Sequence, residues 1–397
     1  MITRARQSIC LLLLTATLAA CGNVSNNDST TNTPGPGGNP PVGSNPPAGG
    51  NPPVGTPPSN DPKPTDPSVP VVDVFMRQSI APLEKGTEEA QGETVGSRLY
   101  MFGGFDGHIN YCCSPSPRAR VFDAQTGKWS KLADMPIPQG SSSPNGGVTH
   151  AGITTDGKAN IYYAGGYTSK NVGGDKPLQQ TFGTKAVFQY SIASNSYTQL
   201  PDLPVPRAAG QLEYVNDTLH YFGGQALGKD PDSADHFVLD LKNLSKGWAK
   251  VSQLNQARNH LGAAQLNGKI YAIGGQTGHD STTRTVATVE VYDPANPDKG
   301  WTLLTAMPYP ASHIEATFVL GNRILVAGGT KGGGRTTEVT SILAFDPTKN
   351  SGMGTWVKLD AELGEPRAGG VAGAIDRGFV YVGGSGKPDA WLFKPVE

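Results

Sequence analysis

Seven polar residues stand at matched places along this 397-residue sequence, and their types could do chemistry together. Three imidazoles and a carboxylate around one opening could bind a metal ion or exchange protons. Arginines two residues before such positions could grip ligands rich in carboxylates or hydroxyls. The candidate ligand-binding residues are Glu89, His150, Arg207, Arg258, His260, His313 and Arg367.

The match between these positions comes from a repeated signal, an apolar run that ends in Gly-Gly. The six copies are residues 99–104, 161–166, 219–224, 270–275, 324–329 and 379–384. Counting back from each pair to the start of the preceding strand gives Glu89, His150, Ala209, His260, His313 and Gly369. The first glycines of successive pairs are 62, 58, 51, 54 and 55 residues apart, a period that indicates a repeat architecture.

Each repeat predicts four short antiparallel strands. A strand of small residues, such as 261–268, precedes the apolar run, and a third strand, such as 289–294, follows Gly-Gly. The fourth strand opens with an aromatic residue: Trp129, Tyr197, Trp248, Trp301 or Trp356. This order resembles the kelch repeat over nearly all of residues 71–397. The resemblance implies a β-propeller, in which each blade hides its apolar faces against two neighbours.

The last repeat ends before a fourth strand, because the chain stops soon after 390–393. Segment 74–82 aligns with the fourth-strand segment 128–136 and can replace the missing strand. We therefore predict an all-β fold, a six-bladed kelch-type β-propeller whose N-terminal strand closes the last blade. Closure removes exposed sheet edges.

The loops between second and third strands are long and polar in the first five repeats, including 105–117 and 167–184. In kelch propellers these loops surround the axial opening on one face, where recognition is expected. The resemblance also implies a scaffold role for the rim arginines and histidines, which commonly bond backbone carbonyls and neighbouring blades. The wide spacing of the histidines works against shared ligation, so we predict no metal and no cofactor.

Two enzymes of kelch type define the catalytic alternatives. Galactose oxidase needs copper, tyrosine and histidine ligands and a tyrosine crosslinked to cysteine. The only cysteines that could form such a crosslink here are Cys112 and Cys113, which follow Tyr111. This disfavours copper-radical oxidation. The adjacent cysteines either form a strained vicinal disulfide or remain thiols. Periplasmic sialic acid mutarotases agree in length and blade number, so a cofactor-independent sugar mutarotase or epimerase, using Glu89 or a histidine as acid and base, stays the alternative.

The first residues predict export. Arg4 and Arg6 precede an apolar run, 9–20, that is too short to span a bilayer but suits a signal peptide. Its end, 18–21, resembles the bacterial lipobox, which implies that residues 1–21 contain the signal and that Cys21 carries lipid. Because Gly22 follows Cys21, we expect a cell-envelope lipoprotein of the outer membrane.

Residues 22–70 predict a disordered tether. Between positions 31 and 70, 14 prolines and 7 glycines fill 21 of 40 positions, and Asn-Pro-Pro-X-Gly recurs at Asn39, Asn45 and Asn51. Such a composition cannot bury a core and behaves as a semi-extended spacer. The folded domain is therefore expected at 71–397.

The charge balance narrows the class of partner. Lysine and arginine total 32 and aspartate and glutamate total 33, so no basic field exists to hold nucleic acid. We expect a membrane-anchored, non-catalytic binding module whose loop-bearing face takes a glycan, a peptide or an envelope protein. The sequence assigns no catalytic residue.

Overall fold

The computed structural model describes residues 73–106, 115–139, 141, 146–171, 178–225, 231–333 and 335–396. The signal, Cys21 and the tether fall in 1–72, and Cys112 and Cys113 fall in 107–114, so these predictions lie outside the described residues. Within the described ranges, the structure contains no apolar helix of membrane-spanning length.

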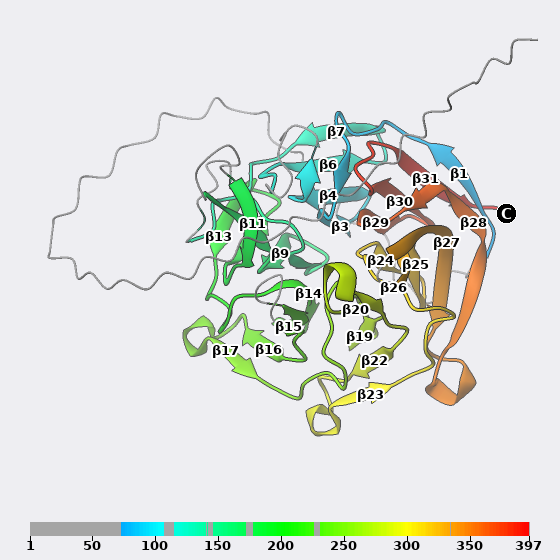
Figure 1. Cartoon of the computed structure of the whole chain (residues 1–397). Helices are drawn as coiled ribbons and strands as arrows, with labels where there is room; N and C mark the ends of the chain where they lie inside the picture. The colour runs from blue at the N-terminus through cyan, green and yellow to red at the C-terminus, as the bar shows by residue number, and fades with distance from the viewer. Residues whose placement is uncertain are drawn as a thin grey trace, which may run out of the picture. The chain divides into compact units, whose positions relative to one another are not determined.

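Six four-stranded antiparallel units surround one axis, which Figure 1 views end on. Blade 1 consists of β3 (Gln91–Val95), β4 (Arg98–Phe102), β6 (Ala119–Asp123) and β7 (Lys128–Lys131). Blade 2 consists of β8 (Gly152–Thr155), β9 (Asn160–Ala164), β12 (Val187–Ser191) and β13 (Ser196–Gln199). Blade 3 consists of β14 (Ala208–Val215), β15 (Thr218–Gln225), β16 (His236–Asp240) and β17 (Trp248–Lys250). Blade 4 consists of β18 (Gly262–Leu266), β19 (Lys269–Ile273), β22 (Val289–Tyr292) and β23 (Trp301–Leu303). Blade 5 consists of β24 (Thr317–Leu320), β25 (Arg323–Ala327), β27 (Arg335–Asp346) and β28 (Thr355–Arg367). Blade 6 consists of β29 (Gly370–Ile375), β30 (Gly378–Gly383), β31 (Ala390–Pro395) and β1 (Phe75–Ser79). The predicted all-β, six-bladed propeller is confirmed.

The N-terminal strand closes the ring, as the sequence predicts. Strand β1 pairs antiparallel with β31, with Phe75 opposite Pro395 and Ser79 opposite Trp391. The buried Phe75 ring meets that of Phe379 edge to face, with 5.3 Å between centroids. The last blade is therefore assembled from both ends of the domain, and no separate seventh unit is present among the described residues.

Each Gly-Gly pair fastens its blade to the next blade. The N–H of the second glycine always donates to the carbonyl of a segment entering the next blade, as from Gly166 to Arg207 at 2.9 Å and from Gly275 to Ala311 at 2.8 Å. Gly165 and Gly166 have φ values of 67° and 97°. A Cβ on Gly165 would lie 2.4 Å from the Arg207 carbonyl oxygen. Only glycine permits both the conformation and this close approach.

The aromatic residue that opens the fourth strand joins the blades farther from the axis. Its polar atom donates to a carbonyl in the segment that leaves the preceding blade, in five successive blades. The pairs are Trp129 to Ala81 (2.8 Å), Tyr197 to Ala133 (2.8 Å), Trp248 to Pro201 (2.8 Å), Trp301 to Ser252 (3.1 Å) and Trp356 to Thr305 (3.1 Å). These residues thus fill the wedge between blades, as predicted, and also link neighbouring blades by hydrogen bonds.

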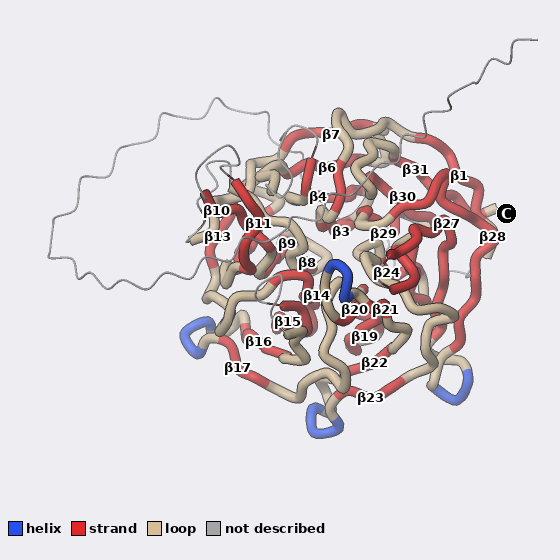
Figure 2. The backbone as a smooth tube through the Cα atoms, in the orientation of Figure 1, coloured by secondary structure: helices blue, strands red, loops and turns tan. Residues whose placement is uncertain are grey.

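Short strands and 3-10 turns decorate the blades. The short strands are β2 (Thr87–Glu88), which pairs with β5 (Phe105–Asp106), β10 (Tyr167–Asn171), which pairs with β11 (Leu178–Gly183), and β20 (Gln276–Thr277), β21 (Arg284–Thr285) and β26 (Thr330–Gly333), which form a layer with β27. The turns are η1 (Leu244–Lys246), η2 (Asp280–Thr282), η3 (Pro297–Lys299) and η4 (Asn350–Gly352). Figure 2 shows three turns at the outer rim and η2 near the centre. We call the face where second-to-third-strand connections emerge the loop-bearing face.

The closing strand offers a test with a built-in control. Replacing the buried Phe75 by alanine should lower the free energy of unfolding by about 3 kcal/mol, because it empties a packed site between both chain ends. Met76, the next residue, is 62% exposed, and Met76→Ala should change stability by less than about 0.5 kcal/mol. Urea denaturation of both variants measures the difference. Equal losses would show that β1 is not anchored through Phe75.

Candidate functional site at the axial opening

Six residues form a closed ring of backbone hydrogen bonds around the propeller axis. Each donates its N–H to the carbonyl of the equivalent residue in the preceding blade. The bonds run from Glu89 to Gly369 (2.8 Å), His150 to Glu89 (3.3 Å), Ala209 to His150 (2.9 Å), His260 to Ala209 (2.8 Å), His313 to His260 (3.1 Å) and Gly369 to His313 (3.1 Å). The six positions matched from the sequence are therefore one structural element, here called the axial ring.

Every residue of the axial ring has a left-handed backbone conformation. Its φ values run from 49° at His260 to 60° at Gly369. This conformation costs an L-residue roughly 1–2 kcal/mol, whereas glycine adopts it freely. Four of the six positions nevertheless carry glutamate or histidine. Retained backbone strain of this kind is frequent at functional sites.

The axial ring brings its four polar side chains into one cluster. Nε2 of His150 lies 3.0 Å from Oε2 of Glu89, and Nε2 of His313 lies 3.7 Å from Oε1 of the same carboxylate. The imidazole centroids of His150 and His260 are 4.8 Å apart, and those of His260 and His313 are 4.3 Å apart. The expectation that the opening holds the histidines too far apart to share a ligand is wrong. The left-handed ring draws them together.

Each histidine of the axial ring is held through Nδ1 by the side chain before it. The pairs are His150 with the hydroxyl of Thr149 (2.8 Å), His260 with the amide oxygen of Asn259, and His313 with the hydroxyl of Ser312 (3.2 Å). The preceding residue is itself fixed by a two-residue antiparallel bridge to the residue after Gly-Gly in the same blade, as between Asn259 and Gln276. The imidazoles are therefore oriented from behind, and Nε2 is the nitrogen left for the opening.

Asp232 sets the tautomer of His260. Its Oδ1 accepts from the amide nitrogens of Asn259 and Gln225, and its Oδ2 accepts from the N–H of Gly278 at 2.8 Å. Because a carboxylate only accepts, the amide oxygen of Asn259 must face His260. Nδ1 of His260 then carries the proton, and Nε2 keeps a lone pair.

The electrostatics of the axial ring favour a single ion pair. Burial alone opposes charge on Glu89 and His150, but their mutual charge and hydrogen bond outweigh it, so the pKa of Glu89 is lowered and the pKa of His150 is raised. Burial holds the pKa of His260 well below its usual range and lowers the pKa of His313 to about 4. The charged forms are thus favoured at Glu89 and His150, and the neutral imidazole is favoured at His260 and His313.

Further glutamates near the axis were missed by the sequence reasoning. Burial raises the pKa of Glu88 and of Glu315 to about 7, and that of Glu93 to about 8. Burial also raises the pKa of Glu213 well above its ordinary value, and the charge of Glu93 adds to this. The available signal was a glutamate inside an inner strand, as Glu93 is within Gln91–Val95.

The three candidate arginines form ion pairs with acidic residues that lie outside the axial ring. The ion pairs join Arg207 to Asp235, Arg258 to Glu290 and Arg367 to Asp389. Arg258 and Arg367 are 0% and 2% exposed, and Arg367 also lies over the Trp391 ring at 5.3 Å. The structure does not bring these arginines into the cluster, and their contact with a ligand stays a prediction.

The comparisons with known proteins agree with this geometry. The family model described as the Kelch motif matches residues 90–136 and 257–308, which include His260 and the Gly-Gly pairs of blades 1 and 4. The domain is a six-bladed β-propeller that contains Kelch motifs. The matches, the six blades and the inter-blade glycines all describe the same repeat.

Several kelch proteins are similar to this chain. Kelch-like protein terF of Aspergillus terreus is 25% identical over 269 residues, covering 67% of this chain and 54% of that protein. Beta-scruin of Limulus polyphemus is 24% identical over 200 residues, covering 50% and 20%. The solved structure of YjhT aligns with a TM-score of 0.58 and 16% identity, over 79% of this chain and 95% of that chain. The chain spans about half or less of the curated relatives it matches, and the structural likeness shows the fold.

The axial ring of this propeller predicts different changes in stability at two small residues. A Cβ on Gly369 would meet the Glu89 amide nitrogen at 3.0 Å in a left-handed conformation, so Gly369→Ala should lose about 1–2 kcal/mol of stability. Ala209→Gly relieves the same conformation but frees the unfolded chain, so its stability should change by less than about 1 kcal/mol. Chemical denaturation distinguishes them, and a Gly369→Ala variant as stable as wild type contradicts the ring.

The raised pKa of Glu93, about 8, predicts a pH dependence of stability. Between pH 4.5 and 8 the folded kelch propeller holds a proton that the unfolded chain releases, so stability falls as the pH rises through this window. Glu93→Gln cannot titrate and should give a shallower decline than wild type. Denaturation midpoints at pH 5, 7 and 9 test this. Identical slopes for both proteins would exclude a protonated Glu93.

Proposed function

We propose that the chain is a protein-binding module, tethered to the cell envelope through a lipid on Cys21, that receives its partner on the loop-bearing face. Kelch propellers generally serve as protein-interaction modules. The tether and lipid rest on the sequence pattern of residues 1–70. The observation that carries the binding face is a second layer of strands over blades 4 and 5.

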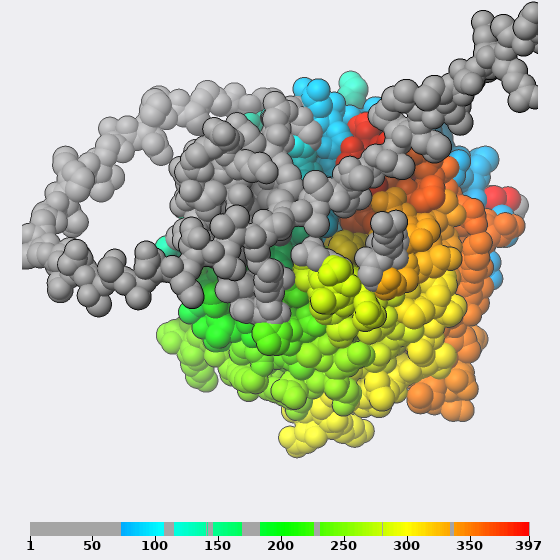
Figure 3. Space-filling view, in the orientation of Figure 1, coloured from blue at the N-terminus to red at the C-terminus, as the bar shows by residue number. Residues whose placement is uncertain are grey.

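This layer joins the loops of two blades into one platform. Strand β20 pairs with β21, β21 meets β26 where Arg284 stands opposite Gly333, and β26 continues into β27. The hydroxyl of Thr285 donates to the carbonyl of Gly332 at 2.7 Å and locks the two loops together. In the space-filling view the yellow-green segment around β20 and β21 stands near the centre of this face (Figure 3). Loops fixed in this way are preorganised to bind.

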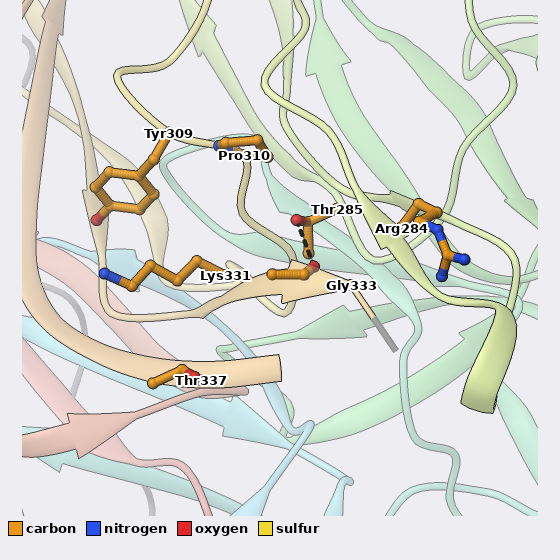
Figure 4. Close-up of a pocket in the computed structure, with 8 residues that line it drawn as sticks. Arg284, Thr285, Tyr309, Pro310, Lys331, Gly333 and Thr337 are labelled. Atoms are coloured by element: carbon orange, nitrogen blue, oxygen red, sulfur yellow. Dashed lines mark hydrogen bonds between the residues drawn. The ribbon is translucent and has the colours of Figure 1, made fainter. Parts of the chain in front are cut away.

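A groove of about 490 Å³ lies beside the platform (Figure 4). Its lining residues are Arg284, Thr285, Tyr309, Pro310, Lys331, Gly332, Gly333 and Thr337. The Lys331 ammonium lies 5.7 Å from the centroid of the Tyr309 ring. Two exposed cations around an aromatic floor suit an extended partner segment that carries a carboxylate.

None of the residues that line the groove belongs to the axial ring, and we place the partner at the groove. Its walls come from neighbouring loops, and its cations are on the surface, where they can steer an encounter. The axial ring, by contrast, holds half-buried and buried side chains that already bond one another. We therefore assign recognition of the protein partner to the groove and not to the axial ring.

Site-specific photocrosslinking in native envelopes tests the proposal. A benzoylphenylalanine in place of Lys331 should give a protein adduct. The same group in place of Lys269, which lines a groove of about 470 Å³ outside the loop-bearing face, should not. The adduct identifies the partner, and Arg284→Glu with Lys331→Glu should then weaken its affinity by more than about tenfold, whereas Lys269→Glu should leave it unchanged.

Four outcomes would overturn the assignment. Equal adducts from positions 331 and 269, or an affinity indifferent to the charge reversals, would remove the groove. Saturable binding of reducing sugars to the purified chain, without a protein adduct, would favour a glycan ligand. Accelerated anomer exchange in those sugars would support the mutarotase or epimerase alternative.

A further inference from the structure

We propose that the axial ring binds one divalent transition-metal ion of the zinc class through Glu89, His150 and His260. This inference goes beyond the proposed function, because the partner groove is lined by other residues than those of the axial ring. It rests on the positions of the ligand atoms, on the groups behind them, and on an unpartnered carboxylate oxygen beside them.

The ligand atoms are within reach of one ion. One ligand atom from each of Glu89, His150 and His260 lies within 4.8 Å of the other two. Zinc binds imidazole nitrogen and carboxylate oxygen at about 2.0–2.2 Å, so its ligand atoms stand roughly 3–4 Å apart. Side-chain adjustments of about 1 Å therefore close the site. The metal would take the place now occupied by the hydrogen between Nε2 of His150 and Oε2 of Glu89, which are 3.0 Å apart.

The groups behind the histidines are those of a metal site. Metal-binding histidines almost always donate their second ring N–H to a nearby oxygen, which fixes the ring and its tautomer. His260 does this toward Asn259, which Asp232 orients, and Nδ1 of His150 lies 2.8 Å from the Thr149 hydroxyl. Nε2 of both rings is thereby offered to the opening. A histidine that only supports the fold does not require the chain of hydrogen bonds from Asp232 through Asn259 to His260.

A buried carboxylate oxygen beside the ring has no partner. Oε2 of Glu315 is buried and accepts no hydrogen bond from any described residue. Glu315 lies two residues after His313 and is close enough to feel the charges of His150 and Glu89. Unsatisfied buried oxygens are rare in folded proteins and often indicate an unseen ion or water. A cation bound in the axial ring would give this oxygen the favourable electrostatic interaction that it lacks.

The donor set selects the class of metal. Two imidazoles and one carboxylate suit zinc and its neighbours copper and nickel, whereas calcium and magnesium require mostly oxygen ligands. His313, whose Nε2 lies 3.7 Å from Oε1 of Glu89, is a candidate for a fourth ligand. Three protein ligands with a replaceable fourth is the arrangement that keeps a metal open to exogenous molecules.

Titration of the untagged full chain with Zn²⁺, followed by calorimetry and metal analysis, tests the site. We expect one Zn²⁺ per chain, no competition from excess Ca²⁺, and an absorption spectrum typical of nitrogen and oxygen ligation when Co²⁺ replaces zinc. His260→Gln and Glu89→Gln should weaken binding by more than about 100-fold. Asp232→Asn, which acts through Asn259, should weaken it by roughly 10–100-fold.

Matched variants separate ligation from folding. Glu93→Gln changes a glutamate four residues along the same segment, and His220→Gln changes a buried histidine of β15, and both should bind zinc within about twofold of wild type, since neither group is a ligand. His313→Gln changes a half-buried side chain, so this variant should fold even if substitution of the buried His260 disturbs the fold. Absence of stoichiometric zinc at micromolar concentrations, or equal affinity in wild type and folded His260→Gln, would overturn the proposal.

Discussion

The structure depends on backbone hydrogen bonds that pass from blade to blade around the axis. The axial ring closes six such bonds on itself, and the second glycine of each Gly-Gly pair adds a further one between neighbouring blades. Both sets require left-handed backbone and close approach of the chain. Because every blade contributes the same bonds, the ring tolerates loops of different length while the geometry at the axis stays constant.

Much of the fold could be predicted from the sequence, because each repeated residue answers a local physical need. Gly165 must be glycine where the Arg207 carbonyl approaches, and Trp248 fills a wedge while donating to Pro201. The platform of β20, β21 and β26 could not be predicted. Its pairing joins loops of different blades. The one register pair between β21 and β26, Arg284 opposite Gly333, follows no periodic pattern in the sequence.

The candidate site was only half predictable. Counting from the Gly-Gly pairs placed Glu89 and the histidines at equivalent positions, but their convergence depends on positive φ, which histidine rarely adopts and which no pattern revealed. The direction of Arg258 was equally hidden, because its partner Glu290 belongs to a third strand whose register sequence alone does not give. The shared cluster and the buried ion pairs are both products of tertiary structure.

Closure by β1 also determines the order in which the molecule can be completed. Strand β1 is made first, yet its partner β31 is made last, and nearly the whole domain lies between them. Contacts this distant in sequence form slowly, whereas the hairpins of a single blade are local. Until β31 has been made, the growing chain carries an unpaired β1 strand and an incomplete last blade, and such unpaired edges invite association with other chains. A nascent propeller of this design therefore exposes its first strand to wrong partners for as long as β31 has not been made.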